Sequence, residues 1–201
     1  NNVWFVMAET SFSPGYFGDI KMYGSMNMGD GSLFKKLEEI DSNYNAKVYI
    51  PSGAISGVDA LKAAGISGIN SVTLTTIKNP ISFKGVKYIE DKKINLSKIK
   101  KDTLLFSGSA KEAVKFFPQN INVAAILSLA GIGQVKTKVN IIASPGTKRN
   151  IHQIAIESNG GKIFCRTENV LHPDNPKTSF LAFLSAVAML RNILNPVRVG
   201  T

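Results

Sequence analysis

Cysteine, histidine and acidic residues are scarce in this 201-residue sequence. The single cysteine, Cys165, excludes a disulfide within the chain, so we expect a hydrophobic core to stabilise the fold in a reducing compartment such as the cytoplasm. His152 and His172, the two histidines, supply no ligand pair at the spacing of a metal site. No apolar run reaches the ~18–20 residues that cross a bilayer, and residues 1–10 lack the basic segment of a signal peptide. We therefore expect neither a metal nor a membrane span.

Three common signatures of nucleotide-binding proteins and hydrolases are also missing. The sequence has no G-x-x-x-x-G-K-[ST] phosphate loop, no G-x-S-x-G nucleophile turn, and no G-x-G-x-x-G fingerprint after a predicted strand. The lone G-x-G at residues 131–133 follows a predicted helix, which is the wrong context for a dinucleotide. These absences argue against a phosphate-loop enzyme and a serine hydrolase.

The charge balance is strongly positive, with 24 Lys and Arg against 14 Asp and Glu and a net charge of +10. Such a balance attracts phosphates, nucleic acid or small anions without choosing among them. Residues 84–102 carry seven lysines and three acids, and we interpret them as a solvated connection, with a phosphate-binding face as the alternative. The aromatic residues fall mostly at core-like positions rather than between basic residues, so the pattern disfavours a nucleic-acid binder.

Periodicity predicts interleaved helices and strands, whereas residues 1–30 show no sustained period. We expect a hairpin turn at residues 159–161, a rigid loop at 173–176, and Thr178 as the N-cap of the last helix. The fold class is thus α/β (α+β), a mixed sheet covered by helices. The predicted helices are 32–40, 55–64, 110–117, 122–130 and 178–194, and the predicted strands are 47–50, 71–77, 104–106, 138–143, 151–158 and 162–170.

A few polar residues stand where folding alone does not require them. His152 follows Lys148 and Arg149, whose charges should lower its pKa and favour a neutral imidazole able to act as a general base; a histidine without this role is the alternative. His172 lies in a proline-rich segment, where a solvated surface histidine is expected. Lys177 is predicted in the first turn of a helix, against the helix dipole, which suggests an anion-binding role.

Seven motifs in order resemble the L-aspartate dehydrogenase family, with matching order and spacing from about residue 32 to the end. Each is weak alone, and the series is specific. They are IPSGAISGVDA (50–60), GSAKEA (108–113), FPQNINVAA (117–125), NIH (150–152), ENV (168–170), NPKTS (175–179) and RVGT (198–201).

The resemblance implies an NAD- or NADP-dependent enzyme that oxidises L-aspartate to iminoaspartate, which hydrolyses to oxaloacetate and ammonia or feeds NAD synthesis through quinolinate. It implies that His152 is the catalytic histidine and that Lys177 and Thr178 hold a substrate carboxylate. It also implies a homodimer joined through the sheet domain. The residues that correspond to contacts of the nicotinamide end are Ala54, Asn120 and Asn122.

The beginning of the chain departs from the family, which has a full dinucleotide-binding domain before the turn at residues 51–54. We expect residues 1–50 to be a remnant of that domain, with residues 1–30 atypical, residues 51–180 to be the catalytic and dimerisation domain, and residues 181–201 to pack back on the remnant. The start on Asn1 suggests a fragment, and Ser144 stands where the family usually has an acid. The alternative is a non-catalytic binding or assembly domain that has lost its dinucleotide-binding half.

Overall fold

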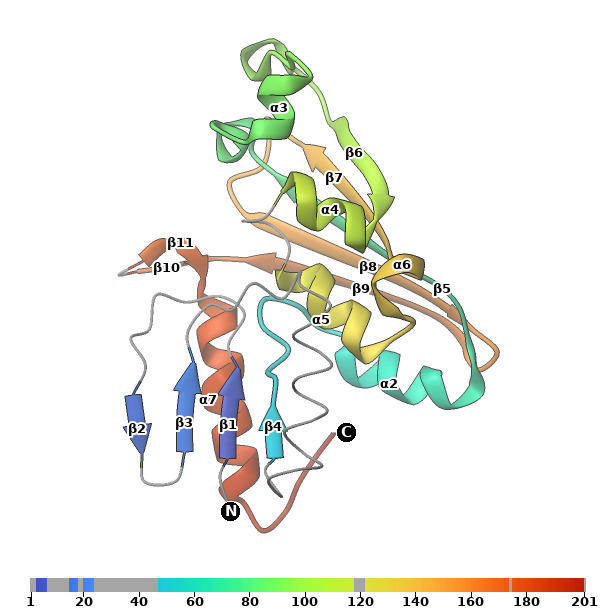
Figure 1. Cartoon of the computed structure of the whole chain (residues 1–201), viewed down its shortest axis with the longest axis vertical. Helices are drawn as coiled ribbons and strands as arrows, with labels where there is room; N and C mark the ends of the chain where they lie inside the picture. Colours follow the sequence, from blue (N-terminus) through green and yellow to red (C-terminus); the bar gives the residue numbers. More distant parts are fainter. Residues whose placement is uncertain are drawn as a thin grey trace.

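The computed structural model describes residues 3–6, 15–17, 20–23, 47–117, 122–173 and 175–200, with side chains for 49–117, 122–173 and 179–200. Within these residues the chain forms two main sheets, a four-stranded sheet near the N-terminus and a five-stranded sheet that carries most of the helices (Figure 1). The helix predicted at residues 32–40 lies outside the described residues.

The four-stranded sheet contains β1 (Val3–Val6), β2 (Gly15–Phe17), β3 (Ile20–Tyr23) and β4 (Lys47–Tyr49) in the order β2-β3-β1-β4. β1 is central and runs parallel to both β3 and β4, whereas β2 is antiparallel to β3. Three of these strands fall in residues 1–30, where sequence periodicity predicted none. Strands of three or four residues are too short to show a sustained alternation.

The five-stranded sheet has the order β6-β7-β5-β8-β9 and mixes parallel and antiparallel pairs. β5 (Ile69–Lys78) runs parallel to β7 (Lys138–Ala143) and antiparallel to β8 (Asn150–Ser158), which forms a hairpin with β9 (Gly161–Asn169). β6 (Thr103–Ser109) pairs antiparallel with β7 at the other edge. The predicted hairpin turn and the predicted fold class, a mixed sheet covered by helices, are both confirmed.

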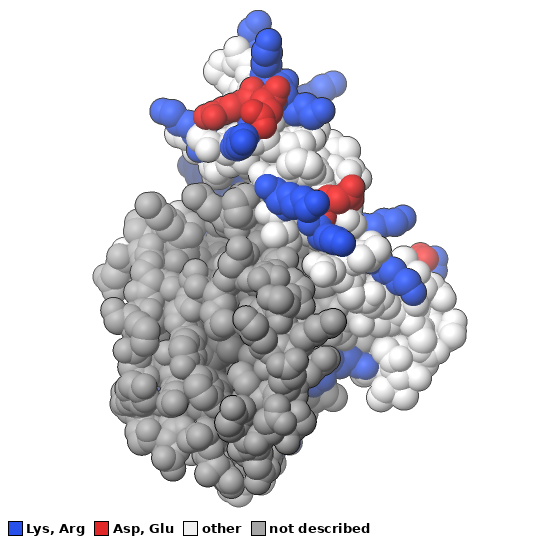
Figure 2. All heavy atoms as spheres, in the orientation of Figure 1, with Lys and Arg blue, Asp and Glu red and all other residues white. Residues whose placement is uncertain are grey.

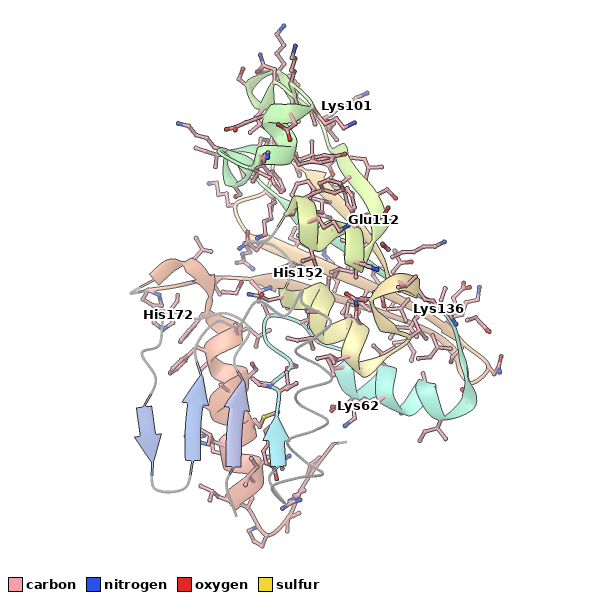
Figure 3. The ribbon with its side chains drawn as sticks, in the orientation of Figure 1. Lys62, Lys101, Glu112, Lys136, His152 and His172 are labelled. Atoms are coloured by element: carbon pink, nitrogen blue, oxygen red, sulfur yellow. The ribbon has the colours of Figure 1, made fainter. Side chains whose placement is uncertain are left out.

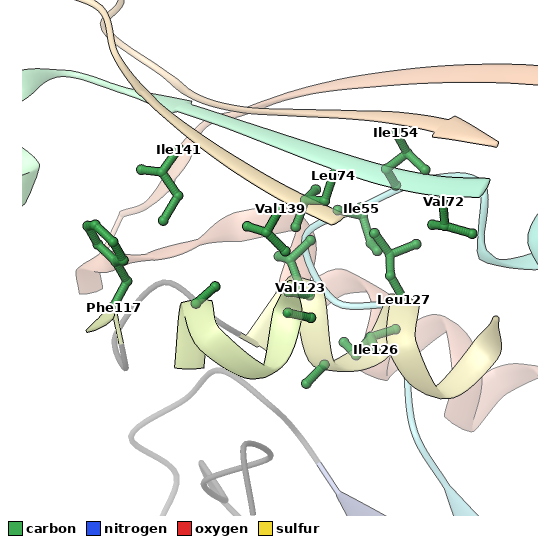
Figure 4. Packing of buried hydrophobic residues seen from close by; sticks show 14 of the residues in the cluster. Ile55, Val72, Leu74, Phe117, Val123, Ile126, Leu127, Val139, Ile141 and Ile154 are labelled. Atoms are coloured by element: carbon green, nitrogen blue, oxygen red, sulfur yellow. The ribbon is translucent and has the colours of Figure 1, made fainter. Parts of the chain in front are cut away.

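Helices cover one face of this sheet and form the core with it. α5 (Asn122–Ala130) packs Val123, Ile126 and Leu127 toward the strand residues Leu74, Val139 and Ile154 (Figure 4). Alternate positions of β5, Val72 and Leu74, are fully buried. The other covering helices are α2 (Val58–Ser67), α4 (Ala110–Phe116) and α6 (Gly133–Lys136).

β6 differs from its prediction, which made residues 104–106 a buried strand. Leu105 and Phe106 are buried, but Leu104 is 56% exposed. The pairing of β6 with β7 shifts register between Leu104 and Phe106. Because a bulge redirects the side chains on one side of it, two consecutive residues point inward and Leu104 points outward.

The segment after Thr178 also differs from its prediction. Residues 175–179 form strand β11 (Asn175–Ser179), which pairs antiparallel with β10 (Leu171–His172). Helix α7 (Phe180–Leu194) therefore begins later, with Ser179 at its N-cap. The N-cap role of Thr178 was wrong, because pairing with β10 keeps this segment extended. The loop predicted at 173–176 is shorter than expected, since Pro173 lies in a turn but residues 175 and 176 belong to β11. Lys177 thus lies in a strand, and the helix-dipole argument for it no longer applies.

The lysine-rich segment protrudes beyond the sheet. It follows η1 (Pro80–Phe83) and contains α3 (Lys87–Asp91) and η2 (Leu96–Lys98), and Ile89 anchors it to the core. All seven of its lysines are exposed, and acidic side chains gather between them (Figure 2). The prediction of a solvated connection is confirmed for this segment.

Gly57, at the N-cap of α2, is required by a close approach as well as by its backbone. Its φ is +87°, and a Cβ there would lie 2.6 Å from Cys165 Sγ. We predict that Gly57→Ala lowers the free energy of unfolding by about 2–4 kcal/mol. Urea denaturation measures this effect.

Gly85 provides the matched control for that prediction. Its φ is +79°, but a Cβ there would meet nothing within 4 Å. Gly85→Ala should therefore cost only the backbone strain, about 1 kcal/mol. Adding Cys165→Ala to Gly57→Ala should restore the stability that Gly57→Ala loses beyond the loss in Gly85→Ala. An equal loss of stability in Gly57→Ala and Gly85→Ala would disprove the close approach.

Candidate active site

The helix-covered face of the five-stranded sheet changes from apolar to polar at one end. Directly paired residues on antiparallel strands share a face, so the register of β5, β8 and β9 defines rows across the sheet. Leu74, Ile154 and Cys165 make one row of the core. The next row is polar and consists of Thr76, His152 and Thr167. A polar row on a buried face needs partners, which makes this end the candidate site.

His152 is the centre of the polar end (Figure 3). It is 4% exposed, and its Nδ1 lies 3.1 Å from the Thr76 Oγ1 in a buried hydrogen bond. Burial and, as the smaller cause, the positive charge of Lys78 together lower the pKa of His152 from 6.5 to about 3. His152 is therefore neutral at pH 7. The sequence predicted the direction correctly but attributed it to Lys148 and Arg149, whereas desolvation is the larger cause.

The turn after β4 approaches the same end of the sheet and is held by both β9 and α7. Gly53 has φ +68° and donates its backbone N–H to Ser185 Oγ of α7 at 3.1 Å. The backbone N–H of Ser56 donates to Thr167 Oγ1 at 3.2 Å. Because Thr167 pairs directly with His152, this contact brings the turn beside the polar row.

Ala54 lies between these two anchors and is 1% exposed. Its carbonyl accepts a hydrogen bond from Asn169 Nδ2 at 2.9 Å. Asn169 pairs with Asn150, two residues before His152, on the same face of the sheet. The structure therefore places Ala54 and His152, two of the residues that the sequence singled out, at the same end of the sheet.

For the remaining predicted site residues, the structure shows no hydrogen bond to His152 or Ala54 among the described residues. Asn122 is the first residue of α5 and is half-buried. Asn120 lies outside the described residues. Lys177 and Thr178 lie on β11, and their side chains lie outside the described part of the chain.

His172 is not the solvated surface histidine that was predicted. It is half-buried, with its ring edge-on to Phe180 at 5.1 Å and to Phe183 at 5.6 Å between ring centroids. The pairing of β10 with β11 folds it back on the start of α7. Packing on two aromatic rings gives it a structural role.

Sequence reasoning missed Thr76, Lys78 and Asn169 as members of the site. The alternation of β5 carried a signal, because Thr76 is a polar residue at a position that continues the buried series of Val72 and Leu74. No group of three or more His, Cys, Asp and Glu that could hold a metal ion occurs in the described ranges. No helix in the same ranges is long and apolar enough to cross a membrane.

Comparison with known proteins supplies the family. A family model described as the C-terminal part of aspartate dehydrogenase matches residues 59–193. The L-aspartate dehydrogenase of Methanococcoides burtonii is 51% identical over 183 residues, which are 91% of this chain and 68% of that protein. The chain belongs to the L-aspartate dehydrogenase family. This family comprises NAD(P)-dependent oxidoreductases, so the predicted family and enzyme class are confirmed.

Further members agree with this assignment. The L-aspartate dehydrogenase of Nitrosopumilus maritimus is 43% identical and covers 86% of this chain and 63% of its own length. The crystal structure of aspartate dehydrogenase from Thermotoga maritima matches with a TM-score of 0.70 at 32% identity, over 86% of this chain and 64% of that one. The chain thus spans about two thirds of the length of its relatives in the aspartate dehydrogenase family.

Proposed function

We propose that this chain oxidises L-aspartate to iminoaspartate with NAD or NADP and that His152 is the proton acceptor. The observation that carries the proposal is a buried, neutral imidazole at the polar end of the sheet, beside the turn that contains Ala54. A neutral base is needed because the α-carbon gives up hydride only after the ammonium group of the substrate has lost a proton. Its Nδ1 bond to Thr76 orients the ring and leaves Nε2 for the substrate.

The substrate itself would adjust the basicity of His152. Lys78 already acts on His152 with its positive charge, so the field at this end of the sheet favours an anion. A carboxylate bound there raises the pKa of His152 from its low value toward the range of an effective base. We assign the holding of a substrate carboxylate to Lys177 and Thr178, as in the family resemblance.

The nicotinamide end of the cofactor would lie against Ala54, Asn120 and Asn122. The fit is supported by the buried acceptor Oδ1 of Asn169, which has no partner among the described residues and lies beside the Ala54 carbonyl. When bound, the cofactor supplies the hydride acceptor for the α-carbon. Residues 1–50 are proposed as part of the dinucleotide-binding half, since β1 runs parallel to two neighbours as in such sheets. The Ser185 bond to Gly53 ties α7 to the turn that directly follows residues 1–50, which supports α7 packing back toward this half.

The direct test incubates the whole protein with L-aspartate and NAD or NADP and follows reduced cofactor by absorbance. We expect turnover with L-aspartate and not with D-aspartate. A folded protein that neither binds NADH nor reduces the cofactor would favour the alternative of a binding or assembly domain. Comparing NAD with NADP defines the preference.

We also propose a homodimer that buries the open face of the five-stranded sheet. The described helices α2, α4, α5 and α6 lie on the other face (Figure 1). Phe164, 66% exposed, and Leu104, 56% exposed, lie on this open face, since they pair with Ala155 and Ile142 rather than with the buried rows.

The lone Cys165 supports a cytoplasmic location.

Phe164→Glu should convert the dimer into a monomer, because a carboxylate would be buried opposite its own copy. Light scattering after gel filtration gives the mass. Val135→Glu is the control, since Val135 is 67% exposed on α6, away from this face. A wild-type monomer, or a dimer that survives Phe164→Glu, would contradict this interface.

A further inference from the structure

Asn169 has an unusual hydrogen-bonding state. It ends β9, is 2% exposed, and donates Nδ2 to the Ala54 carbonyl at 2.9 Å. Its Oδ1 is buried and has no hydrogen-bond partner in the described part of the chain. Buried amide oxygens are nearly always paired, so this one calls for an explanation.

The orientation of the amide group follows from its partner. A carbonyl oxygen only accepts hydrogen bonds, so the NH₂ side of Asn169 must face Ala54. Turning the amide around would place two oxygens against each other. The Oδ1 is therefore held as an acceptor on the other side of the group, and only a donor can satisfy it.

A role as a simple latch for the turn does not account for this arrangement. The same turn is already tied to β9 by the Ser56 N–H bond to Thr167 Oγ1, and Ser56 Oγ lies 3.0 Å from the same atom. A latch uses only Nδ2 and would leave a buried oxygen unsatisfied at a cost in stability. Asn169 lies on the face of the sheet that carries His152, in the row next to it. This position indicates that Oδ1 belongs to the site.

We propose that Asn169 is a binding residue of this site, whose Nδ2 fixes the Ala54 peptide and whose Oδ1 accepts a hydrogen bond from an N–H donor of a bound ligand. The inference rests on the proposed function. That function supplies two sources of such a donor: the amino group of the amino-acid substrate and the carboxamide NH₂ of the nicotinamide ring. Both groups would donate an N–H hydrogen bond to the amide oxygen.

Analogues that lack one donor at a time test the proposal and distinguish the sources. The whole protein is assayed with NAD and with its 3-acetylpyridine analogue, which has no carboxamide N–H. It is also assayed with L-aspartate as substrate and with succinate, which lacks the amino group, as a competitive inhibitor. Asn169→Ala is compared with Ser56→Ala, which loosens the same turn without removing a buried acceptor.

If the donor is the carboxamide, Asn169→Ala should reduce the preference for NAD over the analogue by about 3–10-fold and leave the KM of aspartate relative to the Ki of succinate unchanged. If the donor is the amino group, it should raise the KM of aspartate by a similar factor while the Ki of succinate stays the same. Ser56→Ala should change neither ratio. Both ratios unchanged in Asn169→Ala would overturn the proposal.

Asn169→Asp keeps the proposal testable if the alanine variant does not fold. It retains the side-chain volume and an acceptor oxygen but loses the donor to Ala54, so the discrimination between analogues should persist while the turn loosens. Loss of discrimination in Asn169→Asp would count against the proposal. Failure of the wild-type protein to reduce NAD(P) would instead reject the proposed function, which is a separate result.

Discussion

His152→Ala is expected to lower turnover of L-aspartate by about 10²–10⁴-fold, the usual contribution of a positioned general base. The imidazole is buried, neutral and oriented by Thr76, and no other described histidine lies on this face of the sheet. Steady-state kinetics at saturating cofactor measures the effect on kcat. The dissociation constant of NADH should stay within about threefold, because the ring is assigned to proton transfer rather than to cofactor binding.

Glu157→Ala is the control for that experiment. Glu157 lies on the same strand but at its far end, where it forms an exposed ion pair with Lys162 at 2.8 Å. Its loss should leave turnover within about twofold. Unchanged turnover in His152→Ala would remove His152 from its catalytic role.

Acid should destabilise the wild-type protein through the same histidine. The pKa of His152 is about 3 in the folded state and 6.5 as the ordinary value. Above pH 6.5 the ring is neutral in both states and has no effect on stability. As the pH falls below 6.5 the unfolded chain binds a proton that the folded chain refuses until about pH 3. His152 therefore lowers the free energy of unfolding by about 3 kcal/mol at pH 4.5 and by about 5 kcal/mol at most.

Urea unfolding of the wild type and of His152→Gln at pH 7 and pH 4.5 isolates this contribution. The glutamine variant keeps a polar side chain but does not titrate, so its stability should fall less between the two pH values. The decrease in the free energy of unfolding from pH 7 to pH 4.5 should be larger in the wild type, and the excess over the glutamine variant is the contribution of His152. Parallel losses in both proteins would show that His152 is not buried as a neutral ring.

Elements with strong local signals were predictable from the sequence. α5 and β7 have the predicted bounds, because α5 is rich in apolar and small residues and β7 is a short apolar strand that ends just before Pro145 and Gly146. The N-cap of α7 was missed by one residue. Thr178 and Ser179 are both good N-cap residues, and only pairing of β11 with β10, a tertiary contact, decides between them.

The site was predictable in its parts and not in its assembly. His152 and Ala54 were found through their motifs, but nothing local indicates that Asn169, 115 residues further along the chain, donates to the Ala54 carbonyl. That contact depends on the register of β8 with β9. The cause of the low pKa of His152 was missed for the same reason, because burial is a property of the packed sheet rather than of neighbouring residues.

The β8–β9 register makes folding accuracy and site assembly a single event. A slip of one residue would turn Arg166 and Glu168, which bridge each other at 2.8 Å on the open face, into the core. The same slip would withdraw Asn169 from Ala54 and Thr167 from Ser56. Burying that charged pair is costly, so the misaligned hairpin is unstable as well as unable to hold the turn. Molecules that fold with the correct β8–β9 register therefore also hold the turn beside His152.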